Sequence, residues 1–171
     1  MEVYSSDPRP ERAERVKVGI ADSAVGDAHT TLVTSGLGSC VGIALYDSRA
    51  GVAGLVHAML PRAEDAHGPS TNEAKYVDTG ISALLAAMEV EGARVERTDA
   101  KLAGGSTMFE FTAGGGNIGG RNVEAAHRTL ARVGIDVVAE DVGGSHGRSL
   151  ELSGRTGELA VRSAAHELQT L

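Results

Sequence analysis

Two apolar runs separated by a short turn constrain the fold of this chain more than any other feature of its sequence. Val41 to Tyr46 and Val52 to Met59 are predominantly apolar, and residues 47–51 between them read Asp-Ser-Arg-Ala-Gly, a turn-forming cluster of hairpin length. An antiparallel strand with one face in water alternates apolar and polar residues, and these runs do not alternate. We therefore expect a central hairpin that is covered on both faces.

Further strands and two helices are predicted around this hairpin. The strand candidates are residues 16–20, 30–34, 99–103 and 135–139, and a second hairpin made of 149–152 with 158–162. A Ser-x-x-Glu capping box at Ser70 to Glu73 precedes an apolar pattern of helical spacing that ends at Gly92, and a second helix is expected from about Val123 to Gly134. Helices mixed with strands in hairpins indicate an α+β fold with a mixed or antiparallel sheet.

Length and composition indicate one globular domain. The chain has 171 residues, of which 42% are apolar and 23% charged, a balance that can bury a sizeable core. We expect residues 1–14 to form a mobile N-terminal arm, 15–163 a single domain and 164–171 a tail. There is no run of 18 apolar residues, and the polar start lacks the apolar centre of a signal peptide, so a cytoplasmic protein is expected.

Charge and ligand content argue against several functional classes. A net charge of −7 opposes binding to nucleic acid, and one cysteine with scattered histidines gives no zinc-type ligand spacing, so we expect no metal and no cofactor. Gly114-x-Gly116-x-x-Gly119 formally matches a dinucleotide-binding fingerprint. The run before it is short and charged, and few residues follow Asp141 to complete a Rossmann sheet. A dinucleotide-binding domain is therefore a remote alternative.

Cys40 is the candidate nucleophile. A cysteine nucleophile needs a nearby base and hydrogen-bond donors for the oxyanion that forms during attack. Gly36, Gly38 and Ser39 precede Cys40, and such small residues leave backbone N–H groups free to face a substrate carbonyl. The N–H groups of Ser39 and Cys40 are our candidate oxyanion donors. The alternative is a buried structural thiol at the start of a strand.

His57 is the candidate base. If the central hairpin turns around residues 48–49, residue 57 pairs with residue 40, and the two side chains share one face of the sheet. The alternative for His57 is an imidazole that is hydrogen-bonded inside the core. His146 follows Gly143-Gly144-Ser145 and stays open as a further candidate, whereas the remaining histidines are interpreted as surface residues: His29, His67, His127 and His166.

From about Val16 to Arg162 the chain resembles the chemoreceptor glutamine deamidase family, CheD. The main matching segments are residues 34–47 (Thr-Ser-Gly-Leu-Gly-Ser-Cys-Val-Gly-Ile-Ala-Leu-Tyr-Asp) and 54–61 (Gly-Leu-Val-His-Ala-Met-Leu-Pro). Shorter matches are Lys75-Tyr76, Gly104-Gly105, Met108-Phe109, Asn117-Ile118-Gly119, Arg121-Asn122-Val123, Asp141-Val142-Gly143-Gly144 and Gly147-Arg148.

The resemblance implies an enzyme, a fold and a catalytic set. Thr34, Cys40 and His57 fall on the family's Thr, Cys and His positions, with Thr34 orienting the imidazole. The implied activity is conversion of glutamine side chains of chemotaxis receptors to glutamate through a thioester on Cys40. The implied fold is a three-layer α/β/β sandwich with two main helices, related to the catalytic domain of the cytotoxic necrotizing factor toxins.

The resemblance also implies a protein partner, the CheY phosphatase CheC. A Met-Phe pair in a glycine-rich loop is costly to expose without a partner, so Gly104, Gly105, Met108 and Phe109 are candidate contacts, and the alternative is that Met108 and Phe109 pack into the core. Residues 112–120 form a longer and looser loop than the family motif suggests. A second functional hypothesis is that the chain has the same fold but no catalytic activity, and acts as a regulatory binding module of the phosphatase.

Overall fold

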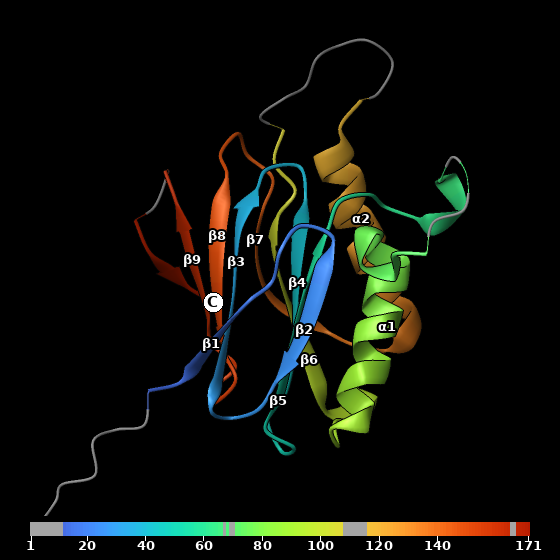
Figure 1. Ribbon diagram of the computed structural model, residues 1–171. Helices are drawn as coiled ribbons and strands as arrows, with labels where there is room; N and C mark the ends of the chain where they lie inside the picture. The colour runs from blue at the N-terminus through green and yellow to red at the C-terminus, as the bar shows by residue number, and fades with distance from the viewer. Residues whose placement is uncertain (1–11, 67, 69–70, 108–115, 165–166) are drawn as a thin grey trace, which may run out of the picture.

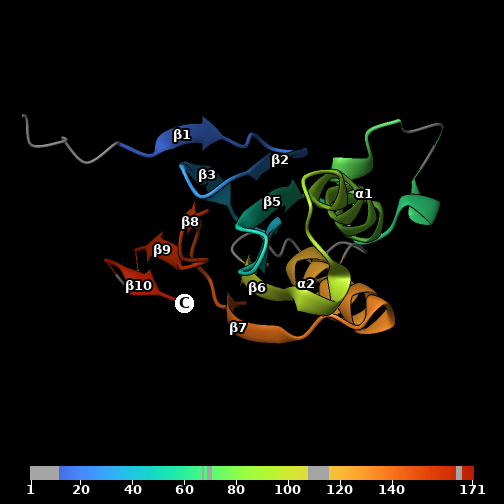
Figure 2. The same ribbon diagram turned by 90° about the horizontal axis from the view of Figure 1, so that it is seen from below.

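Two β-sheets and a helical layer stack into three layers in the computed structural model, which describes residues 12–66, 68, 71–107, 116–164 and 167–171. The outer sheet has the strand order β1-β3-β8-β9-β10, and the central sheet has the order β2-β5-β4-β6-β7. The helices α1 and α2 cover the face of the central sheet that the outer sheet leaves free, as Figures 1 and 2 show. The α+β fold and its α/β/β layering are confirmed.

The elements have the following bounds. The outer sheet contains β1 (Glu14–Lys17), β3 (Thr30–Leu37), β8 (Arg148–Ser153), β9 (Leu159–Ser163) and β10 (Gln169–Thr170). The central sheet contains β2 (Asp22–Gly26), β5 (Val52–Ala58), β4 (Val41–Asp47), β6 (Thr98–Gly104) and β7 (Val137–Val142). The helices are α1 (Val77–Val90) and α2 (Ile118–Val133), with 3₁₀ turns at Ala63–Asp65, Glu73–Lys75 and Val95–Arg97. The pairs β1·β3 and β6·β7 are parallel, and the other pairs within the two sheets are antiparallel.

The central hairpin β4–β5 is buried on both faces, as its uninterrupted apolar sequence predicts. Ile43 and Val56 point into the core that the central sheet shares with the helices. Ala44 and Leu55 point into a second core between the two sheets, which we call the inter-sheet core. Because alternate residues of one strand enter different cores, both faces of the hairpin carry mainly apolar side chains.

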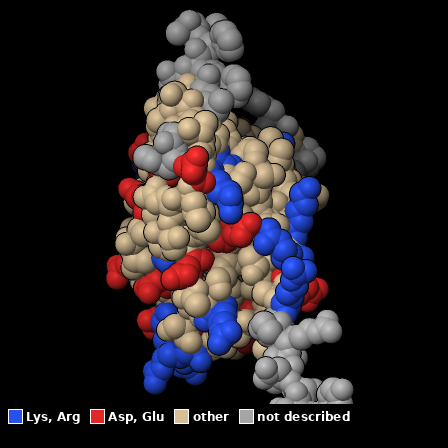
Figure 3. All heavy atoms as spheres, turned by 90° about the vertical axis from the view of Figure 1, so that its left-hand side faces the viewer, with Lys and Arg blue, Asp and Glu red and all other residues tan. Residues whose placement is uncertain are grey.

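The outer sheet has one buried face and one solvent-exposed face, and its strands accordingly alternate apolar and polar residues. Along β8, Leu150 and Leu152 are buried in the inter-sheet core, whereas Glu151 between them is partly exposed. Glu151 pairs with Arg15 of β1 at 2.8 Å. Figure 3 shows acidic and basic side chains interspersed on this side of the molecule. The described residues contain no helix long and apolar enough to cross a membrane.

Helix α1 begins later than its capping box predicts. Asn72 acts as a cap, since its side chain accepts a hydrogen bond from the N–H of Ala74, and it starts only the 3₁₀ turn Glu73–Lys75. Tyr76 is extended and forms a parallel bridge with Leu60, and this pairing delays the helix until Val77. Ser70 lies outside the described residues.

Other boundaries match more closely. Gly134 ends α2 in the left-handed conformation, with φ of 80°, as its position after the apolar pattern predicts. The start of α2 is earlier than expected, because the side chain of Asn117 caps it by accepting from the N–H of Gly120. Strand β2 is absent from the sequence-based prediction, since Asp-Ser-Ala-Val-Gly lacks the β-branched enrichment of the other strands.

Candidate active site

Thr34 and His57 form a hydrogen-bonded pair in the layer between the two sheets. Thr34 lies on β3 with 4% of its surface exposed, and His57 lies on β5 with 0% exposed. The Thr34 Oγ1 atom lies 2.8 Å from His57 Nδ1 and 2.7 Å from the carbonyl oxygen of Val18. The hydroxyl has a single hydrogen, and a carbonyl oxygen only accepts, so that hydrogen is donated to Val18. Thr34 must then accept a hydrogen from Nδ1 of His57.

This arrangement sets the tautomer of the imidazole. A neutral histidine carries one ring hydrogen, and the assignment above places it on Nδ1. The Nε2 atom is left with an unshared pair, which is the form that removes a proton from another group. Nε2 is buried and has no hydrogen-bond partner among the residues that the structure describes. The imidazole is therefore only half satisfied, in contrast to a fully hydrogen-bonded core histidine.

The predicted register between Cys40 and His57 is wrong by two residues. The ladder between β4 and β5 pairs His57 with Gly42, and its last pair at the turn is Asp47 with Val52. The turn therefore comprises residues 48–51, and its centre lies later than the predicted 48–49. Cys40 precedes the first residue of β4 and packs against the inter-sheet core, the layer that also contains His57 and Thr34.

Glycine at position 42 lets the outer sheet pack closely against β4 at the residue that pairs with His57. A Cβ atom at Gly42 would lie 2.5 Å from Leu150 Cδ1 and 3.3 Å from Leu37 Cδ1, both in the inter-sheet core. Directly paired residues in an antiparallel ladder project to the same face. The outer sheet therefore packs directly over the position that a side chain opposite His57 needs.

Burial shifts the pKa values of His57 and Cys40 in opposite directions. Desolvation lowers the pKa of His57 below its ordinary value, because burial penalises the charged imidazolium. Desolvation raises the pKa of the Cys40 thiol, and the thiol's own backbone N–H acts against this rise. Both effects favour the neutral forms. Burial therefore favours an uncharged thiol and an uncharged imidazole at rest.

Three consecutive carbonyl groups anchor the loop that carries Cys40. The carbonyl oxygens of Gly38 and Cys40 accept from the N–H groups of Ser106 and Gly105, each at 2.8 Å. The carbonyl of Ser39 accepts from Asn122 Nδ2 at 2.8 Å. In a trans peptide the C=O and the following N–H point in opposite directions. The N–H groups of Ser39 and Cys40 are therefore turned away from these anchors.

Sequence comparison identifies the family. The profile described as "CheD chemotactic sensory transduction" matches residues 59–163. The "Probable chemoreceptor glutamine deamidase CheD" of Haloarcula marismortui is 49% identical over 175 residues and covers 100% of both chains. The "Chemoreceptor glutamine deamidase CheD" of Halalkalibacterium halodurans is 45% identical over 150 residues, covering 86% of this chain and 93% of the relative. The chain belongs to the CheD family.

Solved structures resemble this CheD-family chain only distantly. Neisseria meningitidis protein NMB0706 gives a TM-score of 0.48 at 13% identity, covering 80% of this chain and 62% of the other. The C-terminal domain of CNFy from Yersinia pseudotuberculosis gives 0.38 at 11% identity, with 92% and 61% covered.

The other residues predicted to form the site of this CheD-family chain lie at or just after the end of β6, in the β7–β8 loop, or outside the described residues. Gly104 and Gly105 are buried behind the Cys40 loop, and Gly105 contacts Gly119 of α2. Met108 and Phe109 lie outside the described residues, as does the first part of loop 112–120. His146 lies beside Gly144 in the β7–β8 loop, and its buried Nε2 has no partner within the described part of the chain. The described residues contain no group of three or more His, Cys, Asp or Glu that could hold a metal ion.

The dinucleotide fingerprint is not supported by its place in the fold. The fingerprint directly follows a strand of a parallel sheet. In this CheD-family chain Gly114 comes ten residues after Gly104, the last residue of β6, and β6 pairs antiparallel with β4. The space beside Gly119 is filled by the carbonyl oxygens of Ser106 and Gly105, which lie 2.3 and 2.6 Å from the position of an added Cβ, so the small residue lets α2 pack against that backbone.

Asn122 is a site residue that sequence reasoning missed. It lies on α2 with 0% exposure, and its amide reaches the loop that carries Cys40. The sequence does hint at this role, because Asn122 lies four residues before the buried Ala126 and so falls on the apolar face of the helix, where a polar residue is unusual. A buried amide on the packing face of a helix needs hydrogen-bond partners outside that helix.

Proposed function

We propose that this chain is a protein-glutamine deamidase that converts glutamine side chains of chemotaxis receptors to glutamate, with Cys40 as nucleophile and His57 as base. The observation that carries the proposal is the Thr34–His57 hydrogen bond, which leaves a buried basic Nε2 atom in the same layer as Cys40. The substrate class is taken from the printed names of the relatives. A cytoplasmic location is part of the proposal.

In the first half of the reaction, ammonia is released. His57 Nε2 takes the thiol proton while Cys40 Sγ bonds to the carboxamide carbon of the glutamine. The oxyanion that forms is stabilised by the N–H groups of Ser39 and Cys40, which point away from the groups that anchor the neighbouring carbonyls. The imidazolium then gives its proton to the amide nitrogen, the C–N bond breaks, and a thioester remains.

In the second half of the reaction, water releases the glutamate. Nε2 of His57 removes a proton from a water molecule as the water oxygen bonds to the thioester carbon. The C–S bond breaks, and the sulfur of Cys40 recovers a proton from the imidazolium. The sum is consumption of one water and release of one ammonia for each glutamine.

The proposal is tested by incubation with the cytoplasmic fragment of a receptor. We expect mass spectrometry of tryptic peptides to show the mass change of glutamine-to-glutamate conversion at a small set of positions, together with released ammonia. Receptor incubated with buffer alone controls for spontaneous deamidation. A fully folded protein that produced no conversion on receptors from its own cell would contradict the proposal and favour the regulatory binding module.

Thr34→Val is expected to slow deamidation about 10- to 100-fold, the scale at which residues that orient a reactive imidazole act. Valine keeps the shape of threonine but removes the hydroxyl, so His57 Nδ1 loses the acceptor that sets its tautomer. Steady-state kinetics on the receptor fragment measure the change. Thr34→Ser keeps the hydroxyl and serves as the matched control, with nearly normal kcat. A raised KM with unchanged kcat would instead make Thr34 a substrate contact.

Iodoacetamide is expected to alkylate Cys40 slowly at neutral pH and faster as the pH rises, because burial raises the pKa of its thiol. Only the thiolate reacts, and its population grows as pH approaches the elevated pKa. The rate is followed by mass spectrometry, with glutathione as the unperturbed control thiol. A reaction midpoint below that of glutathione would show a thiolate paired with imidazolium, and the neutral resting pair would be wrong.

Binding of a CheC-type phosphatase is a further part of the proposal. It rests on the Met-Phe pair at 108–109, next to the described Gly104–Thr107 segment. Gly104 and Gly105 are buried, so their contribution to a partner surface would be to position the residues that follow them.

A further inference from the structure

Asn122 connects the two segments that carry the proposed nucleophile and the proposed base. Its Nδ2 atom donates to the carbonyl oxygen of Ser39 at 2.8 Å and to that of Met59 at 2.9 Å. Ser39 directly precedes Cys40, and Met59 follows His57 by two residues. One fully buried amide nitrogen thus holds both backbones at the same point.

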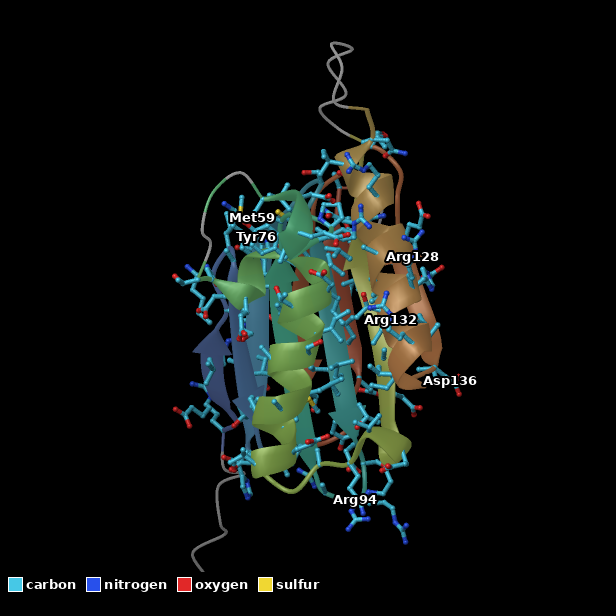
Figure 4. All side chains as sticks on the ribbon, turned by 90° about the vertical axis from the view of Figure 1, so that its right-hand side faces the viewer. Met59, Tyr76, Arg94, Arg128, Arg132 and Asp136 are labelled. Carbon is cyan, nitrogen blue, oxygen red and sulfur yellow. The ribbon has the colours of Figure 1, made fainter. Side chains whose placement is uncertain are left out.

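The connection lies where the strand ladder stops. The last pair of the β4–β5 ladder at this end is Val41 with Ala58, and the next two residues along the strands are Cys40 and Met59. Beyond the last pair, the Asn122 amide replaces the backbone ladder between the two segments. Figure 4 shows Met59 at this end of the central sheet beside Tyr76, with Arg94 at the opposite end.

Helix α2 presents Asn122 to this point from a fixed position. Gly119, one turn earlier, lies against the carbonyl oxygens of Gly105 and Ser106, so the helix cannot shift without disturbing that backbone. A helical side chain points toward the N-terminal turn of its own helix, and Asn122 therefore projects toward the Gly119 contact. Ser106 and Gly105 in turn donate to the carbonyls of Gly38 and Cys40.

We infer that Asn122 is a positioning residue for the Cys40–His57 pair. Its bond to the Ser39 carbonyl orients the Ser39–Cys40 peptide and with it the Cys40 N–H, while its bond to Met59 holds the same point to the His57 strand. This inference rests on the proposed function. The Asn122 Oδ1 atom has no hydrogen-bond partner among the described residues, so the amide is used from its donor end alone.

Asn122→Asp is the decisive variant because it keeps the shape of the side chain and removes both N–H donors. A carboxylate also faces the Ser39 and Met59 carbonyls with like partial charge. We expect kcat to fall about 100-fold, the effect of a small misplacement of reacting groups, with KM changed less than about threefold. The Cys40 backbone amide resonance in ¹H–¹⁵N NMR spectra is expected to move, independently of any assay of activity.

Leu130→Ala is the matched control on the same helix. Leu130 is fully buried in the core between the central sheet and the helices, about two turns after Asn122, so its truncation lowers stability through lost packing. We expect kcat per folded molecule and the Cys40 amide resonance to stay normal in this variant. If Asn122→Asp does not fold, Asn122→Ala, which removes the donors without adding charge, is compared in the same two measurements.

The outcomes separate the inference from the proposed function. Equal kcat per folded molecule in the Asn122 variant and Leu130→Ala, with an unmoved Cys40 resonance, would overturn the positioning role and leave a purely structural amide. Retained deamidation in a folded Cys40→Ala protein would instead remove the proposed chemistry, whatever the Asn122 variants show.

Discussion

Replacement of Cys40 by alanine is expected to reduce receptor deamidation to the rate of the receptor alone, with the fold intact. Cys40 is partly exposed and borders the inter-sheet core, so loss of one sulfur atom removes little packing. The reaction loses the atom that bonds to the substrate, and no other cysteine exists in the chain to replace it. Mass spectrometry of receptor peptides and circular dichroism of the variant measure the two parts of this prediction.

His57→Gln is expected to lower kcat about 10²- to 10⁴-fold, the range attributed to a positioned general base. Glutamine retains an N–H that can donate to Thr34 but has no basic atom, so the comparison isolates proton transfer. His127→Gln is the matched control, because His127 is 44% exposed and pairs with Glu140 on the surface. Similar activity of the two variants would exclude His57 as the base.

Gly104→Ala is expected to lower both stability and kcat. Gly104 has φ of 105°, and an added Cβ would lie 2.4 Å from the carbonyl oxygen of Cys40, a backbone atom that cannot rotate away. The Cys40 loop must therefore move. We expect a loss of about 4 kcal/mol or more in the free energy of unfolding and a fall of about 100-fold in kcat of the folded fraction.

Gly92→Ala is the matched control, because it separates the effect of backbone strain from the effect of displacing the Cys40 loop. Gly92 has φ of 100°, close to that of Gly104, but no atom lies within 4 Å of its added Cβ. It shares only the backbone strain, about 1–2 kcal/mol, and kcat is expected to stay normal. Urea denaturation and steady-state kinetics of both variants test this. A normal kcat in Gly104→Ala would show that the Cys40 loop tolerates the shift.

Local patterns in the sequence were sufficient for the elements whose stability is local. The two-sided burial of β4 and β5 follows from an apolar run without alternation, and the end of α2 follows from Gly134, which adopts a backbone conformation that other residues resist. The predicted start of α1 was wrong because the β-bridge between Leu60 and Tyr76 keeps Tyr76 extended, and the local capping pattern does not reveal this bridge. The predicted pairing of Cys40 with His57 was wrong because it depends on the length of the turn, and the composition of residues 48–51 does not specify which residues form the last pair of the ladder.

Residue chemistry alone is enough to pick out the candidate side chains: one cysteine, a histidine within an apolar run, and a threonine within a β-branched run. How these side chains meet depends on the tertiary structure. The hydroxyl of Thr34 meets His57 Nδ1 because two sheets pack face to face, and Asn122 reaches Ser39 and Met59 because α2 lies against the Gly105–Ser106 backbone. These contacts join residues far apart in the chain, and a hydrogen bond between them requires a precise distance and angle that no sequence spacing encodes.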